Sequence, residues 1–315
     1  MKYGFGIDLG GTTVKLAYFD QEGALLDKWE IPTVTADGGS RILPDIAASI
    51  RSYLDRNGIP NSDIIGIGIG VPGPVDAKGV VNRCVNLGWG VFNVEQTLSS
   101  LTGFPVRAGN DANMAALGEC WKGSGQGCEN LIMVTLGTGI GGGIIINGKP
   151  VCGARGAAGE IGYLVLDREE QEVHSSGNRG CAEQYCSATG VVRLATRYLN
   201  SHAVSSPLRQ VSPLTCKAVF DAAGAGDQAA TEILAQFYSL LGEFLADLCD
   251  VLDPELVLLG GGVSKAGDTL LEGIRPHFQR HVFHAIRDVR FAIAALGNDA
   301  GAYGAFRLAL QSFGV

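Results

Sequence analysis

The chain has 315 residues, 46% hydrophobic and 18% charged, a composition typical of a globular protein. Its formal net charge of −8, without a run of lysines or arginines, argues against a nucleic acid or an anionic membrane surface as partner. The chain enters a strand pattern within its first residues, and no apolar run reaches the about 18 residues of a membrane helix. We therefore expect a cytoplasmic protein that acts on small molecules and, at this length, has two domains.

The glycine and cysteine contents also indicate the class of protein. The 46 glycines are about twice the usual share and gather in turns between apolar runs, without the repeat of collagen. The eight cysteines are scattered through apolar or helical contexts. We expect reduced, mostly buried thiols rather than a disulfide framework.

The first element is the segment from Gly4 to Asp20, GFGIDLGGTTVKLAYFD, which predicts a strand, a glycine turn and a second strand. Glycines without Cβ let backbone N–H groups approach a phosphate, and the hydroxyls and the lysine that follow add donors and charge. The acid before the turn is placed to hold a hydrated magnesium ion. An ordinary hairpin with a glycine bulge is the alternative for this segment alone. The candidate nucleotide-binding residues are Asp8, Gly10, Gly11, Thr12, Thr13 and Lys15.

A second copy of this segment favours the phosphate-binding turn over the ordinary hairpin. The stretch from Met133 to Lys149, MVTLGTGIGGGIIINGK, aligns with the first without a gap, Leu136 over Leu9 and Gly137 over Gly10. A duplicated glycine turn predicts two related domains that present phosphate-binding loops to a shared cleft. The candidate residues of the second loop are Gly137, Thr138 and Gly139.

Between the two copies the chain alternates strands and helices. Residues 24–31 predict a third strand, and a helix capped by Ser40 runs to about Arg56 with apolar residues on one face. Residues 64–71, IIGIGIGV, predict a buried strand over which another segment passes closely. Asn93 is expected to cap a helix over 94–101, followed by a strand over 105–108 and a helix over 114–121.

A loop with the sequence VNLGWGVFN follows the isoleucine–glycine strand. Asn86 and Trp89 combine an amide with an aromatic face, which is what a sugar ring needs. Asn86 is therefore a candidate substrate-binding residue. Trp89 is equally well explained as a core anchor.

The pair Asn110 and Asp111 stands at the end of a strand and the start of a helix. In open α/β sheets ligands gather at the carboxyl ends of strands. Asp111 is interpreted as a general base that takes a proton from an attacking hydroxyl, which Asn110 orients. The alternative is that Asp111 serves only as the N-cap of the helix.

The second half carries further candidates in glycine-rich loops. Glu160 and Tyr163 lie in GAAGEIGY, and Glu183 opens a helix predicted to continue past Leu194, where it could simply complement the helix dipole. His174, Cys181 and Cys186 suggest a metal site, but four ligands at a convincing spacing are missing.

The last part of the chain predicts a long helix over 228–252 and a strand over 255–259 that runs into a third glycine turn, of the kind that accommodates adenosine. In the next helix three histidines share a face, and we favour a solvated basic face over an adventitious metal site there. A strand over 290–296 and a helix over 300–310, with small residues for a close crossing, end the chain. The third-turn residues are Gly260, Gly261 and Gly262, and the histidines are His277, His281 and His284.

These motifs together resemble the ROK family of repressors, open reading frames and sugar kinases, and within it the bacterial glucokinase-like members. The blocks, in order, are DLGGTTVK, GVPGPV, NLGW, GNDANMAALGE, LGTGIGGGI, GAAGEIGY, GNRGCAE, LGGGVS and AGAYGA. The resemblance implies an actin-like ATPase (RNase H-like) fold, with two duplicated α/β domains and mixed sheets around a central cleft. It also implies a small N-terminal domain over 1–110 plus 298–315 and a large C-terminal domain over 111–297 that carries the sugar loops.

The same resemblance implies a kinase that uses ATP and Mg²⁺ to phosphorylate a hexose, in the first place glucose to glucose 6-phosphate, in a homodimer. The family's catalytic base falls on Asp111 and its sugar contacts on Asn110, Glu160 and Glu183. Its phosphate loops fall on the three glycine turns. Related substrates are N-acetylmannosamine, mannose, fructose, allose or a β-glucoside.

Two departures from the family pattern concern a structural zinc. Tyr163 stands where the family usually has histidine, and His174 and Ser176 stand where it usually has cysteines, so only Cys181 remains of four ligands. We therefore expect no structural zinc, and Tyr163 becomes a substrate-binding candidate. The rival classes are a non-enzymatic sugar-sensing regulator, which would place a DNA-binding helix-turn-helix before the first strand, and an actin-like assembly ATPase.

Overall fold

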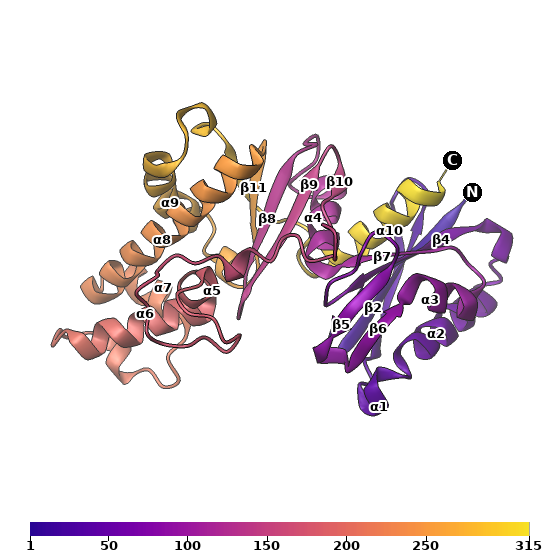
Figure 1. Ribbon diagram of the computed structural model, residues 1–315, viewed down its shortest axis with the longest axis horizontal. Helices are drawn as coiled ribbons and strands as arrows, with labels where there is room; N and C mark the ends of the chain where they lie inside the picture. Colours follow the sequence, from indigo (N-terminus) through magenta and orange to yellow (C-terminus); the bar gives the residue numbers. More distant parts are fainter. Residues whose placement is uncertain (315) are drawn as a thin grey trace. The chain divides into compact units, whose positions relative to one another are not determined.

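The structure is a computed structural model that describes residues 1–314. The chain groups into two compact units, drawn with the sequence running from indigo to yellow in Figure 1. The first unit contains Met1–Leu131, Gly143–Gly159 and the chain from Ala295 onward, and the second contains Ile132–Gly142 and Glu160–Ala294. This grouping puts the helix that begins at Asp111 in the first unit, whereas the boundary expected from the sequence lies in front of it.

The first unit is built on a mixed sheet with the strand order β3-β2-β1-β4-β7. The first three strands form the expected antiparallel meander, and β4 pairs in parallel with both β1 and β7. The predicted strands are thereby confirmed. The strands are β1 (Tyr3–Leu9), β2 (Thr13–Asp20), β3 (Leu25–Pro32), β4 (Ile64–Val71) and β7 (Val106–Asn110).

Helices cover both faces of this sheet. α2 buries Ile42, Ile46 and Ile50 in a core that includes Phe5 and Ile7 of β1. The prediction that Ser40 caps this helix is wrong, because Ser40 already has helical dihedral angles as the residue that ends α1, and Arg41 precedes α2. The helices are α1 (Ala36–Gly39), α2 (Ile42–Asn57), α3 (Val94–Thr102), α4 (Asp111–Lys122) and α10 (Ala300–Phe313).

The closing helix α10 passes over the opposite face at backbone contact distance (Figure 1). A Cβ on Gly6 would lie 2.0 Å from the carbonyl oxygen of Ala302, and one on Gly68 would lie 1.7 Å from that of Ala305. A Cβ on Gly304 would lie 1.7 Å from the carbonyl oxygen of Met114 in α4. The close crossing predicted from the glycines of β4 and the small residues of α10 is confirmed, and it explains why α4 groups with the first unit.

The segment expected to be a loop around Trp89 is instead a hairpin of β5 (Val80–Cys84) and β6 (Trp89–Asn93), joined by a short 3₁₀ turn over Val85–Leu87. Trp89 is 5% exposed, and its indole N–H donates to the carbonyl oxygen of Gly39 at 3.2 Å. Trp89 is therefore a core anchor, the second of the two interpretations.

The second sheet has the order β10-β9-β8-β11-β12, which repeats the order of the first sheet with the meander strands followed by two later ones. This repetition agrees with the duplication read from the glycine turns. The strands are β8 (Leu131–Leu136), β9 (Ile140–Ile146), β10 (Lys149–Pro150), β11 (Leu256–Gly260) and β12 (Arg290–Ile293).

Two predictions about the helices of the second unit are wrong. The helix expected to run from Glu183 past Leu194 is broken at Ser187, whose extended backbone lets its hydroxyl accept from the Gly190 N–H and begin α6. α9 ends at His281, and His284 lies in a separate 3₁₀ turn, so the three histidines do not share one helix face. The helices are α5 (Ala182–Cys186), α6 (Ala188–Ser201), α7 (Cys216–Gly224), α8 (Gln228–Leu252) and α9 (Asp268–His281).

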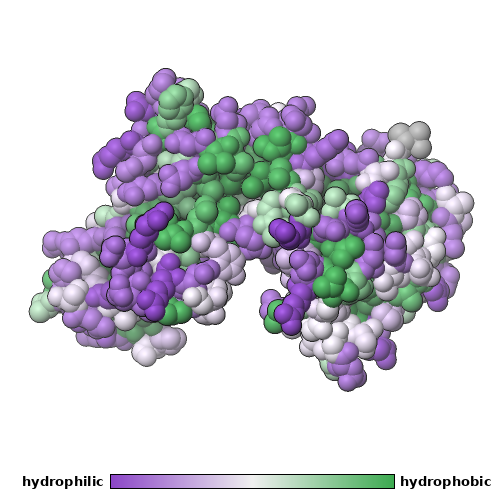
Figure 2. Space-filling model, viewed as in Figure 1, coloured by the Kyte–Doolittle hydropathy of each residue, from purple (hydrophilic) through white to green (hydrophobic). Residues whose placement is uncertain are grey.

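Hydrophilic side chains cover much of the visible surface in Figure 2, with apolar areas between them. Within residues 1–314, no helix combines the length and the apolar character that crossing a membrane requires.

Candidate active site

The predicted base stands where β7 ends and α4 begins. Asn110 has an extended backbone, and its Oδ1 accepts from the N–H groups of Ala112 and Asn113 at 3.0 and 3.2 Å. Asn110 is therefore the N-cap, and the alternative that Asp111 serves only as the cap is wrong. The Asp111 Oδ1 accepts from the Asn110 amide at 2.9 Å and from the Ala112 N–H at 2.8 Å. The amide of Asn110 also donates to the Gly73 carbonyl at 3.3 Å, so it holds the carboxylate in a fixed orientation.

Burial sets the electrostatics of this carboxylate. It raises the pKa of Asp111 to about 6, the Ala112 N–H acts in the opposite direction, and the negative charge of Asp8 raises it further. Burial also raises the pKa of Asp8, against the lowering influence of Lys15. A carboxylate with a pKa near neutrality is suited to accept a proton and release it again.

Two hydrogen bonds from Thr33 hold the first glycine turn in place. The Thr33 hydroxyl donates to the Gly10 carbonyl at 2.7 Å, and the Thr33 N–H donates to the Thr12 carbonyl at 2.9 Å. A Cβ on Gly10 would lie 2.9 Å from the Thr13 carbonyl oxygen, whereas one on Gly11 would meet nothing within 4 Å. The protein's own packing therefore requires a glycine at position 10 but leaves the space over Gly11 free.

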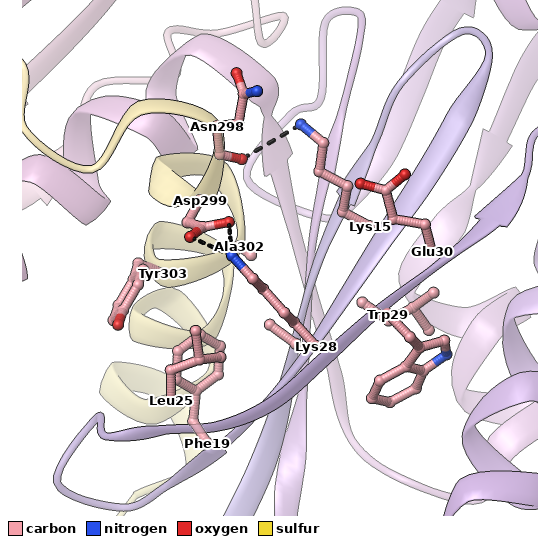
Figure 3. Close-up of a pocket in the computed structure, with 12 residues that line it drawn as sticks. Lys15, Phe19, Leu25, Lys28, Trp29, Glu30, Asn298, Asp299, Ala302 and Tyr303 are labelled. Carbon is pink, nitrogen blue, oxygen red and sulfur yellow. Dashed lines mark hydrogen bonds and ion pairs between the residues drawn. The ribbon is translucent and has the colours of Figure 1, made fainter.

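Lys15 connects this turn to a cavity of about 330 Å³ between β2, β3 and the start of α10, shown in Figure 3. Its ammonium lies 3.4 Å from Asp8 Oδ2 and donates to the Asn298 carbonyl at 3.3 Å. Lower in the same view Lys28 pairs with Asp299 at 2.8 Å. Lys15 thus holds its charge beside the carboxylate expected to bind magnesium.

Asn86 lies apart from these contacts, exposed in the 3₁₀ turn between β5 and β6. The buried neighbours Leu87 and Trp89 fix this turn to the core of the first unit. Asn86 is available to a ligand, and it takes no part in the hydrogen bonds that join Asn110 to Gly73 and Asp111.

In the second unit Glu183 lies against the second glycine turn. Its Oε2 accepts from the Ile140 N–H at 2.7 Å, and a Cβ on Gly139 would lie 2.3 Å from that oxygen. Its Oε1 lies 3.2 Å from Nε2 of His174. Sequence reasoning missed this contact, because His174 was considered only as a metal ligand.

Two further candidates share the electrostatic surroundings of Glu183. Burial and then the charge of Glu183 raise the pKa of Glu160. Burial, followed by Glu160 and Glu183, raises the pKa of Tyr163, whose side chain is 47% exposed. The structure therefore brings Glu160, Tyr163, Glu183 and His174 together in one acidic neighbourhood.

The second and third glycine turns lie beside each other. The Gly137 N–H donates to the Gly139 carbonyl at 2.9 Å, and the Thr189 hydroxyl donates to the Thr138 carbonyl at 2.7 Å. Gly261 has a φ of +81°, and a Cβ on it would lie 2.5 Å from the Leu136 carbonyl oxygen. Gly260 packs against Met133, whereas a Cβ on Gly262 would meet nothing within 4 Å.

A second cavity, of about 360 Å³, follows the third turn. It is lined by α7, α8, Ala266 in the 3₁₀ turn after Gly262, and Thr269 at the start of α9. Phe220 and Tyr238 supply aromatic walls, and the Tyr238 hydroxyl is buried without a hydrogen-bond partner among residues 1–314. Sequence reasoning did not identify these two residues, because neither belongs to a motif.

No group of three or more histidine, cysteine, aspartate or glutamate side chains among residues 1–314 is arranged to hold a metal ion. Cys181 is fully buried with its sulfur 3.8 Å from the Gln184 side-chain oxygen, and the Nδ1 of His174 lies 2.9 Å from the Ser176 hydroxyl. This donor set does not fit the tetrahedral thiolate and imidazole site that zinc requires.

A sheet order that occurs twice, with a glycine turn after the first strand of each copy, defines a protein of the actin-like ATPase class. The model of the ROK family matches residues 4–312, and the chain belongs to this family. It is 43% identical to a glucokinase of Halalkalibacterium halodurans over 95% of this chain and 92% of the relative, and 32% identical to an N-acetylgalactosamine kinase of a Shewanella species over 96% and 94%. A solved ROK glucokinase from Streptomyces griseus, in complex with glucose and AMPPNP, is 33% identical, with a TM-score of 0.75 over 98% of this chain and 99% of that one. The protein is an ATP-dependent sugar kinase.

Proposed function

We propose that the protein transfers the γ-phosphoryl group of ATP to a hexose hydroxyl, in the first place converting glucose to glucose 6-phosphate, with Asp111 as general base. The observation that carries this proposal is the partly buried Asp111 carboxylate, whose pKa is raised to about 6 and which is oriented by the amide of Asn110. In this role Asp111 accepts the proton of the attacking hydroxyl as the new phosphorus–oxygen bond forms.

The glycine turns support the proposed nucleotide site. In each turn one glycine is not required by packing, since a Cβ on Gly11 or Gly262 would meet nothing within 4 Å and one on Gly137 would meet only an atom at 3.9 Å. Such open backbone is what a phosphate needs for close approach to N–H groups. We assign the adenine to the neighbouring cavity, which Phe220 and Tyr238 line. The buried hydroxyl of Tyr238 has no hydrogen-bond partner within residues 1–314 and could bond to the base.

Asp8 fits the magnesium ion that kinases use. Mg²⁺ keeps several waters and is held by one or two carboxylates together with substrate phosphates. Asp8 lies one residue before the end of β1, in front of the first glycine turn, and is partly buried beside Lys15. When bound, the ion would neutralise phosphate charge, and Lys15 would add a second positive charge.

For the sugar we assign Glu183, Glu160 and Tyr163 in the second unit, and Asn110 and Asn86 in the first. Two carboxylates suit a ligand rich in hydroxyl groups, because each can accept several hydrogen bonds. A phenol at position 163 keeps one donor and acceptor on a body that can stack on a ring. We therefore expect more tolerance at carbons 1 and 2 than a strict glucokinase has, so that a β-glucoside, mannose or N-acetylmannosamine is also used.

The test is ADP release with glucose and with this panel of sugars, for the wild type and Tyr163→His. We expect activity on glucose and no ATP hydrolysis without sugar. The ranking of the sugars should change in the variant, because a side chain that hydrogen-bonds a sugar hydroxyl rejects analogues that lack it more strongly than a side chain that stacks on the ring does. ATP hydrolysis that ignores added sugar would instead favour an assembly ATPase. An unchanged ranking with glucose alone as substrate would make Tyr163 a structural residue.

A further inference from the structure

The loop formed by residues 164–181 is fastened at both ends. The Ala182 N–H donates to the Leu164 carbonyl at 2.7 Å, and the N–H groups of Leu166 and Asp167 donate to the Gly180 carbonyl at 2.8 and 3.1 Å. Gly180 has a φ of +67°, and a Cβ there would lie 1.7 Å from the Asp167 carbonyl oxygen. The two ends of the loop therefore run side by side in backbone contact.

The centre of the loop is held by Glu170, whose side chain is only 3% exposed. Arg197 donates to both of its oxygens, at 2.8 and 2.9 Å, and Arg193 donates to one of them as well. The Tyr185 hydroxyl donates at 2.6 Å. Hydrogen bonds from Arg197 in the first place hold the pKa of Glu170 far below its usual range, so the carboxylate is charged and fully compensated.

A second carboxylate extends this contact. Glu172 accepts from Nε of Arg193 at 2.9 Å and from Arg197 at 2.7 Å, and its backbone carbonyl accepts from the Gln184 amide at 3.0 Å. We call Glu170, Glu172, Arg193 and Arg197 the charge clamp. It ties the middle of the loop to α6, and the Gln184 contact ties it to α5.

His174 lies two residues after Glu172 of the clamp. Its backbone N–H donates to the Asn178 carbonyl at 2.7 Å, its Nδ1 lies 2.9 Å from the Ser176 hydroxyl, and its Nε2 reaches Glu183 at 3.2 Å. The clamp therefore fixes the stretch of chain from which His174 contacts the carboxylate assigned to the sugar.

The positions at which the family resemblance implies zinc ligands carry Tyr163, His174, Ser176 and Cys181. The Cys181 sulfur lies against the Gln184 side chain, and the His174 imidazole lies between the Ser176 hydroxyl and Glu183. The residues that would fasten this loop through a metal do not fit one here, while the clamp supplies ionic contacts, centred on the buried Glu170 carboxylate, to the same loop.

We propose that the charge clamp replaces a structural metal as the fastening of the 164–181 loop, and that His174, held by it, acts as a positioning residue that orients Glu183 for the sugar. The second part rests on the proposed role of Glu183 in sugar binding. The clamp itself stands on the geometry of the loop alone.

The experiment compares four variants with the wild type. Glu170→Gln removes the central charge, and His174→Ala removes the positioning contact. Arg197→Lys keeps the positive charge but loses the guanidinium that donates to both oxygens of Glu170. Glu232→Gln is the matched control, because Glu232 accepts from Tyr198 of α6 outside the clamp. The readouts are amide hydrogen exchange of residues 164–181, the KM values for glucose and ATP, kcat, and the amount of bound zinc. All are measured on the protein as purified and again after dialysis against EDTA followed by dialysis into buffer with magnesium.

We expect Glu170→Gln to speed amide exchange in the loop at least about tenfold, because loss of the buried carboxylate leaves the arginine charges without their central partner and loosens the segment. The glucose KM should rise about five- to tenfold, with the ATP KM and kcat within about twofold of the wild type. Arg197→Lys should fall between this variant and the wild type. His174→Ala should raise the glucose KM without changing loop exchange. Glu232→Gln and the EDTA-treated wild type should behave as the untreated wild type.

The proposal fails if Glu170→Gln leaves loop exchange and glucose KM within about twofold of the wild type, or if EDTA removes one zinc per chain and frees the loop. Should Glu170→Gln not fold, Glu172→Gln replaces it, because that side chain is 55% exposed and shares the same arginines. If no sugar is phosphorylated, the proposed function fails, but the exchange and zinc measurements still decide on the clamp.

Discussion

Asp111 is a residue at which catalysis and stability oppose each other. In Asp111→Asn the Oδ1 can still accept from Ala112 and Asn110, so the fold should persist, while kcat should fall by about 10²–10⁴ without a general base. Because the folded pKa is raised, the ionised carboxyl destabilises the native state above pH 6, and the amide should stabilise it at neutral pH by about 1–3 kcal/mol. Steady-state kinetics and thermal unfolding test this. A variant with more than about a tenth of the wild-type kcat would contradict the assignment.

The same carboxylate predicts a pH dependence. Only the deprotonated form accepts a proton, so kcat/KM should fall about tenfold for each pH unit below about 6 and stay level above it. The profile is measured from pH 4.5 to 8 with glucose well below its KM. The residual activity of Asp111→Asn serves as the control and should lack this inflection; an inflection that persists in the variant would belong to another group.

At the scale of the element, the third glycine turn contains one glycine that packing requires, Gly261, and one that it does not, Gly262. Gly262→Ala places its Cβ in open space and should leave stability within about 0.5 kcal/mol of the wild type while raising the ATP KM about tenfold. Gly261→Ala combines a φ of +81° with a backbone contact and should cost about 1–3 kcal/mol. Gly90→Ala, also in open space but outside the predicted site, is the control. Equal ATP KM values for Gly262→Ala and Gly90→Ala would remove the third turn from the phosphate site.

At the scale of the whole molecule, the first unit is completed by both ends of the chain. α10 covers β1 and β4 through glycines, and Phe306 stacks on the fully buried Phe19 with ring centroids 5.0 Å apart. A chain that ends at Asp299 should therefore lose the cooperative unfolding of this unit and expose an apolar sheet face. Gly304→Ala, with its Cβ directed at the Met114 carbonyl, is the milder variant and should cost about 1–3 kcal/mol. A soluble truncated chain with unchanged near-ultraviolet circular dichroism would show that α10 is dispensable.

Much of the fold and of the candidate site could be predicted because it is encoded locally. Alternation and apolar runs gave the meander strands, β4, β11 and the exact span of α8 at 228–252. The alignment of two glycine turns predicted a duplication that the strand order repeats. Glycines in β4 and small residues in α10 predicted a close crossing, since only residues without bulky side chains permit one. The position of Asp111 at a strand end followed from the same local signals.

Other features were decided only by tertiary structure, because they depend on partners distant in the chain. Both Asn110 and Asp111 are good caps, and only the backbone geometry shows that Asn110 takes this role. Trp89 suits a sugar or a core equally well until Gly39 is seen to accept its N–H. The contact of His174 with Glu183 and the clamp on Glu170 join segments whose spacing carries no motif, so burial and charge compensation, rather than sequence pattern, determine them.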